Sequence, residues 1–159
     1  MPGATSAPPN FSAPTATPPT GIGVSVDAGV VKGGGFLRIE PTGVSGALEL
    51  ALTLGSVEIA IRAVGVLETV EGRISFVIVM SVEFSPAIEL FLGLTLNAVG
   101  GVFGVNRTLD ANALTATVRA GRMDDVMFPH DLAARAIEVI ASVKQVFPAR
   151  LDQVVAGPM

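Results

Sequence analysis

Apolar residues alternate with polar or small residues through most of the chain, beginning at Gly21. The clearest run is 48–54, where leucine occupies every second position and Glu49, Ala51 and Thr53 lie between the leucines. A period of two places the leucines on one face of a β-strand, because successive side chains of a strand point to opposite faces. The alternation therefore predicts a sheet with one strongly apolar face.

Short turn sequences divide this region into the strands of an antiparallel meander. Gly55-Ser56 separates the leucine run from a second alternating run, 57–63, and Glu71-Gly72 precedes a third, 74–84. Two-residue connections of this kind join neighbouring antiparallel strands. The run 74–84 is the longest and is partly apolar on both faces, so we expect it to be a central strand.

Glycine and proline predict further boundaries. Gly33-Gly34-Gly35 indicates a tight turn or bulge before a short strand, 36–40. Ser85-Pro86 is expected to turn the chain into a strand over 88–96, and the glycine-rich stretch 99–105 predicts a short, sharply bent strand. With the alternating residues of 22–27, the count is six or seven strands.

The period changes to a helical one after Asn106. Asp110 suits the N-cap of a helix over 111–120, and Asp131 suits the N-cap of a second helix from 132 to about 146. The second helix carries apolar residues at helical spacing. Strands followed by helices predict an α+β fold, in which the helices cover the apolar face of the sheet.

The chain is thus expected to have three parts. Residues 1–20 are rich in Pro, Ala, Thr and Ser without apolar periodicity, which predicts a disordered tail. Residues 21–108 are expected to form the antiparallel sheet. Residues 109–159 are expected to form a helical C-terminal segment that packs on it.

Deleting residues 1–20 is expected to change the melting temperature by no more than about 2 °C, because the tail offers no periodic apolar residues to a core. Differential scanning calorimetry of the shortened and full chains measures this. A larger fall would show that the tail packs on the fold.

Composition excludes several classes of function. The net charge is −4, only 15% of the residues are charged, and no basic patch is present to neutralise phosphates, so nucleic-acid binding is not expected. The absence of cysteine excludes disulfides, thiolate catalysis and zinc–thiolate sites. Half of the residues are apolar, which provides a large core and favours exposed apolar surface as well.

One group of residues faintly resembles a metal cluster. His130, the single histidine, lies near Asp124, Asp125 and Asp131 in the sequence. The acidic residues are better explained by helix capping and by the preference for acids in a first helical turn. We therefore expect no metal ligands and no cofactor.

The other candidates for catalytic residues are four carboxylates on the predicted strands: Glu49, Glu58, Glu83 and Glu89. They alternate with strongly apolar positions, so a solvated face of the sheet explains them better than a catalytic pair. No nucleophile motif accompanies them. We expect no catalytic residues and a protein that is not an enzyme.

The stretch 90–106 lacks charge and approaches the length of a membrane helix. Four glycines interrupt it and its leucines alternate, so we expect strand, turn and strand rather than a membrane span. No secretory signal is visible at the N-terminus, so the cytoplasm is the default expectation, although a chain without cysteine suits either redox environment and leaves the compartment open.

A set of short motifs covers roughly half of the chain, from about Glu83 to Met159. They include Pro86-Ala87-Ile88-Glu89-Leu90, Gly100-Gly101, Asn106-Arg107-Thr108, Phe128-Pro129, Phe147-Pro148 and Gly157-Pro158-Met159. As a set they resemble an uncharacterised bacterial domain-of-unknown-function family that is found in very long β-rich proteins. The resemblance implies no active site. It implies that related chains continue with further strands.

These observations favour a structural or self-assembling β-rich module that pairs with itself or with a larger β-rich protein through a sheet edge. Lys32 and Lys144 are the only lysines, so few charges protect the edges of the sheet. The alternative is a carrier for an apolar ligand such as lipid, which the excess of aliphatic residues supports.

Overall fold

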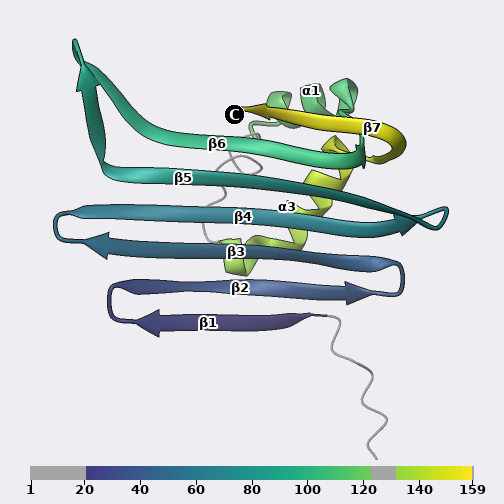
Figure 1. Cartoon of the computed structure of the whole chain (residues 1–159), viewed down its shortest axis with the longest axis horizontal. Coiled ribbons are helices and arrows are strands. Elements are labelled where there is room, and N and C mark those ends of the chain that lie inside the picture. Colours follow the sequence, from purple (N-terminus) through teal and green to yellow (C-terminus); the bar gives the residue numbers. More distant parts are fainter. Residues whose placement is uncertain (1–20, 123–131, 159) are drawn as a thin grey trace, which may run out of the picture.

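The computed structural model describes residues 21–122 and 132–158, which form one antiparallel sheet with helices packed on it (Figure 1). The strands lie in the sheet in chain order. They are β1 (Ile22–Ala28), β2 (Val31–Glu40), β3 (Gly43–Leu54), β4 (Val57–Val70), β5 (Arg73–Phe91), β6 (Leu94–Arg107) and β7 (Ala149–Pro158). The helices α1 (Ala111–Arg119) and α3 (Leu132–Val146) connect β6 to β7. The predicted α+β class and antiparallel meander are confirmed.

The predicted hairpin turns around Gly55 and Gly72 are confirmed. Gly55 has φ 64° and Gly72 has φ 75°, a region of backbone conformation that glycine adopts without steric cost. The run 74–84 lies within β5, which has β4 and β6 as its neighbours, so its interior place in the sheet is also confirmed.

The glycine run Gly33-Gly34-Gly35 does not form a turn. It lies in the middle of β2, where Gly33 pairs with Val26 on one side and with Leu50 on the other. A Cβ at position 33 would lie 2.1 Å from the carbonyl oxygen of Glu49. Glycine therefore allows a close approach of β2 and β3 rather than a reversal, and the strand begins at Val31 instead of residue 36.

The predicted turn at Ser85-Pro86 is also wrong. Strand β5 continues through the cis peptide bond before Pro86, and its pairing with β6 is irregular between Glu83 and Ile88 and again between Glu89 and Phe91. The chain reverses at Leu92-Gly93, where both residues have positive φ. The stretch 99–105 is accordingly part of the long strand β6.

The C-terminal segment is helical in its first part only. Asp110 caps α1 as predicted, since its carboxylate accepts hydrogen bonds of 2.9 Å from the backbone N–H groups of Asn112 and Ala113. Helix α3 has the predicted bounds, whereas its predicted cap, Asp131, lies outside the described residues. Residues 149–158 return as β7 and pair with β6, a strand that the sequence interpretation missed.

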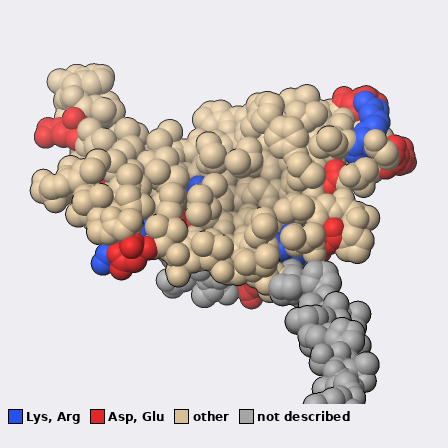
Figure 2. Space-filling model, turned by 60° about the horizontal axis from the view of Figure 1, so that its bottom comes forward, with Lys and Arg blue, Asp and Glu red and all other residues tan. Residues whose placement is uncertain are grey.

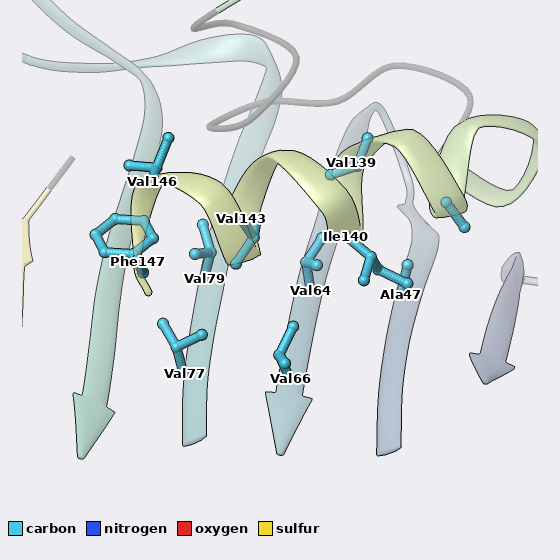
Figure 3. Packing of buried hydrophobic residues seen from close by; sticks show 11 residues of the cluster. Ala47, Val64, Val66, Val77, Val79, Val139, Ile140, Val143, Val146 and Phe147 are labelled. Carbon is cyan, nitrogen blue, oxygen red and sulfur yellow. The ribbon is translucent and has the colours of Figure 1, made fainter. Parts of the chain in front are cut away.

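The core lies between α3 and the middle of the sheet (Figure 3). Helix α3 packs on β2, β3 and β4, and its Ile140 and Val143 face Val64 and Val79 of the sheet. The helix therefore covers the face that also carries Glu49, and not the leucine face. The expectation that the helices cover the most apolar face is wrong. Valines make the centre of the face that carries Glu49 apolar as well, and α3 packs on these valines.

Candidate binding surface

The face of the sheet opposite α3, called here the open face, is apolar on all seven strands. Where the strands pair regularly, this face carries every second residue of each strand, namely the residues in register with Leu48 of β3. Its larger side chains are Ile22, Val24, Val26, Leu37, Ile39, Val44, Leu48, Leu50, Leu52, Leu54, Ile59, Ile61, Leu67, Ile74, Phe76, Ile78, Met80, Val82, Val99, Phe103, Val105 and Val154. None of the described helices lies over them.

Many of these side chains are open to solvent although they belong to interior strands. Met80, near the middle of β5, is 50% exposed, and Leu48 on β3 is 41% exposed. Figure 2 shows much of the molecule's surface as tan, with charged atoms gathered toward the ends of the strands and the lower margin. A contiguous apolar surface of this extent is typical of a contact surface, since monomeric soluble proteins rarely expose one.

Charge is segregated between the two faces. Among the regularly paired residues of β1–β7 that the structure describes, the open face has no charged side chain, and Thr69 is its one polar residue. The face toward α3 holds Lys32, Glu49, Arg62 and Glu68. Over its regularly paired residues the described open face therefore offers Thr69 alone to orient a hydrophilic ligand.

The open face has relief at its centre. Gly46 and Gly65 pair across β3 and β4, and a hollow of about 330 Å³ lies over them beside Leu67 and Ile78. A second apolar hollow, of about 350 Å³, lies over Gly101. The ring centroids of Phe76 and Phe103 lie 5.7 Å apart between these hollows. Hollows beside large side chains suit a packed contact better than a flat surface does.

Two of the four candidate carboxylates meet at one arginine. Arg62 Nε donates to Glu49 Oε1 at 3.0 Å, and Arg62 Nη1 donates to Glu83. Burial works against the charge of Arg62, but the hydrogen bonds to Glu83 and Glu49 raise the pKa of its guanidinium overall. Glu49 and Glu83 are thus half-buried on the face toward α3, and the expectation that they are solvated is wrong for these two. Glu58 and Glu89 are exposed, as expected.

A second ionic cluster fixes the end of α3 to the sheet. Lys144 Nζ lies 2.8 Å from Glu40 Oε2 and 2.9 Å from Glu68 Oε1. Arg107, buried on β6, donates to Glu68 Oε2 at 2.6 Å and to the carbonyl oxygen of Phe147 at 3.0 Å. These contacts join residues that are far apart in the sequence, and their role is to hold the helix on the sheet.

The pKa values of this cluster follow from its pairing. The hydrogen bond from Lys144 lowers the pKa of Glu40. Burial raises the pKa of Glu68, but the hydrogen bonds from Lys144 and Arg107 outweigh it and lower that pKa overall. Burial opposes the charge of Lys144, yet its bonds to Glu40 and Glu68 raise its pKa. All three groups are therefore held ionised at neutral pH.

The stabilisation by this cluster is expected to disappear in acid. A carboxyl whose pKa is lowered on folding stabilises the fold above its unfolded value, near 4.5, and loses that effect as the pH falls through the folded value. The raised pKa of Lys144 gives stabilisation below about 10.5 that is lost at higher pH. Urea unfolding between pH 3 and 7 should show stability falling below about pH 4.5. Lys144→Met should make that fall shallower, and an unchanged slope would contradict the assignment.

The two edges of the sheet are β1 and β7. All seven residues of β1 are exposed, and Asp27 is its single charge. The leucine run 48–54 lies in the interior strand β3, and the segment 88–96 lies in the β5–β6 hairpin. The hairpin projects past the rest of the sheet at one corner of Figure 1, and its Leu92 is 92% exposed.

The remaining candidates for a metal site cannot be placed. His130, Asp124, Asp125 and Asp131 lie outside the described residues. Within residues 21–122 and 132–158, no group of three or more His, Asp or Glu is arranged to hold a metal ion.

The predicted strand, turn and strand over 90–106 are confirmed by β5 and β6. Over the described part of the chain, no helix has the length and apolar character needed to cross a membrane.

A family of unknown function, DUF6603, matches residues 3–159, so the chain belongs to that family. The expected membership of a family of unknown function is confirmed, over nearly the whole chain rather than its second half. No curated protein and no solved structure is significantly similar to the chain.

Proposed function

We propose that this member of DUF6603 is a non-catalytic structural module that assembles through the open face of its sheet, with itself or with a larger β-rich protein. The observation that carries the proposal is a seven-stranded apolar face that no described helix covers and whose regularly paired, described residues are uncharged. Covering such a face is favourable by about 25 cal/mol for each Å² of apolar surface removed from water. Contact through the face replaces the contact through an edge that the sequence suggested.

Two further observations support a structural role. The ionisable groups of the two described clusters, around Arg62 and around Lys144, are joined in ion pairs, which suits them to holding the fold. The resemblance of the second half of the chain to domains of very long bacterial β-rich proteins supports the same role, since such a chain would bring further sheets to this face.

The alternative function is that of a carrier for an apolar ligand such as lipid. The apolar hollow over Gly101, lined by Met80, Val82 and Phe103, favours it. Extraction of the purified protein with organic solvent, followed by mass spectrometry, tests this alternative. A stoichiometric apolar molecule would support the carrier, whereas its absence would favour assembly.

A charge placed on the open face is expected to weaken assembly by about a hundredfold or more, because the contact would bury an unpaired ammonium group. Met80→Lys is suitable, since Met80 is half-exposed and the change leaves the core intact. Ile137→Lys is the matched control, because Ile137 is exposed to a similar degree, 57%, on α3. Sedimentation velocity over a concentration series measures the mass of each variant.

Association that is lost with Met80→Lys and kept with Ile137→Lys supports the open face as the contact. Equal association of the two variants would place the contact elsewhere. A wild-type chain that is monomeric at high micromolar concentration, with no apolar ligand bound, would overturn both the assembly module and the carrier.

A further inference from the structure

We propose that the occupant of the open face is a second copy of this chain. The two sheets stack face to face around a two-fold axis that runs parallel to the strands, midway between β4 and β5. This inference rests on the proposed function, to which it adds the partner and the geometry. In this arrangement β4 of each copy lies over β5 of the other, and β3 lies over β6.

The area of the open face matches what a stable dimer needs. The overlap would comprise β2 to β7. At about 4.8 Å between strands and about 3.4 Å per residue, it measures roughly 25–30 Å across the strands and roughly 30 Å along them. Its area is therefore on the order of 800 Å² per copy. Stable protein interfaces bury about 800 Å² on each partner. The face is thus large enough to form a dimer without help from the edges.

The charge distribution also suits a second copy. A two-fold interface brings the same patch of both partners together, so each charge on it would need an opposite charge elsewhere on that patch. The open face avoids this, since its regularly paired residues are uncharged in the part of the sheet that the structure describes. A membrane surface is a poorer partner, because the net charge of −4 opposes anionic headgroups.

The relief of the face is complementary to itself about this axis. One row of paired residues crosses the sheet in the order Gly46, Gly65, Ile78 and Phe103. Rotation about the axis places Ile78 of one copy over Gly65 of the second copy, and Phe103 over Gly46. Each large side chain therefore meets a glycine, and the hollow of about 330 Å³ over the two glycines is filled.

The next row shows the same complementarity. It crosses the sheet in the order Leu48, Ala63, Met80 and Gly101. The same rotation places Met80 over Ala63 of the second copy and Leu48 over Gly101, which fills the hollow of about 350 Å³. Because the axis is parallel to the strands, it also maps the twist of one sheet onto the same twist of the other. The two faces can then stay at the spacing of about 10 Å that packed sheets adopt.

Two substitutions that exchange large and small side chains test this geometry. Gly65→Val adds a side chain where a Cβ meets nothing within 4 Å of its own chain, so it should leave the monomer folded and crowd Ile78 of the second copy. Ile78→Ala should leave a void over Gly65. Gly23→Val is the matched control, since Gly23 is equally uncrowded but lies on the other face of β1.

We expect Gly65→Val to weaken dimerisation at least tenfold, since overpacking disrupts well-packed contacts, and Gly23→Val to leave it unchanged. Mixing the Gly65→Val and Ile78→Ala chains should favour the mixed dimer. In the mixed dimer the valine at position 65 meets the alanine at position 78, and the other contact keeps its native pair. Native mass spectrometry separates the three dimers by mass, and the mixed one should exceed its statistical half.

The outcomes separate this inference from the proposed function. Dimers of the wild-type chain that tolerate Gly65→Val, or that mix statistically with Ile78→Ala chains, would overturn the stacking geometry. If Met80→Lys still abolished those dimers, the open face would remain the contact. A wild-type chain that stays monomeric but binds another β-rich protein through the face would refute the second copy alone. A monomer with no apolar partner would refute both.

Discussion

Replacing Arg107 by alanine is expected to lower the free energy of unfolding by about 3–5 kcal/mol, the usual cost of removing one partner from a buried ion pair. Arg107 is only 1% exposed, and its guanidinium donates to the carboxylate of Glu68 and to the carbonyl oxygen of Phe147. The alanine variant leaves that carbonyl without its donor, and leaves Glu68 with Lys144 as its remaining described cation. The junction of α3 with β4 and β6 should therefore loosen.

Urea unfolding followed by circular dichroism measures this loss. Arg73→Ala is the matched control, because Arg73 also forms a two-bonded ion pair, with Asp152, but on the surface. Exposed pairs contribute little to stability, so the control should lose far less than the Arg107 variant. Similar losses for the two variants would mean that burial does not determine the contribution of Arg107.

Replacing Phe147 by alanine is the second large loss that we expect, at about 3–5 kcal/mol. Phe147 follows α3 directly, is 5% exposed, and packs with Val146 and Val143 in the core between helix and sheet (Figure 3). Its side chain fills the place where the helix ends against the sheet, so truncation leaves a cavity that the neighbouring β-branched residues cannot readily close.

Phe91→Ala is the control for the loss of an aromatic ring. Phe91 lies in the β5–β6 hairpin and is 63% exposed, so its removal should change stability by no more than about 0.5 kcal/mol. Thermal unfolding of the two variants gives the comparison. A small loss of stability with Phe147→Ala together with a large loss with Phe91→Ala would contradict the placement of the core under α3.

Much of the sheet could be predicted because alternation and turn residues act locally. The leucines from Leu48 to Leu54 share a face, and the turns around Gly55 and Gly72 are where the sequence indicates. The last strand was missed because Pro148 and the short run of residues after it follow a helix. The pairing of this run with β6 depends on the free edge of β6, which the sequence of the run itself does not indicate.

The face that the helix covers could not be predicted from alternation. Val64, Val66, Val77 and Val79 make the centre of one face apolar, while leucine and isoleucine make the whole of the other face apolar. Both faces can accept a helix on these grounds. The ion pairs of Lys144 with Glu40 and Glu68 favour the observed face, and they join positions that no local pattern relates.

The candidate surface was partly foreseen. Low charge and long apolar strands predicted association, but the predicted contact was a sheet edge rather than a face of the sheet. One signal could have identified the face. In β3, β4 and β5 the residues in line with Leu48 include no charge, whereas the alternate residues include Glu49, Arg62 and Glu83. These three charges pair with one another on the face that α3 covers, which leaves the uncharged face for a partner.

The most direct test of the open face as a contact surface is the reactivity of a single cysteine placed on it. The chain has no cysteine of its own, so Met80→Cys and Ile137→Cys each report one position. The rate of labelling by a thiol reagent is measured from low to high micromolar protein. We predict that labelling at position 80 slows as the concentration rises, while labelling at position 137 does not change. Rates at position 80 that stay constant over the whole range, in a protein that does associate, would contradict the account.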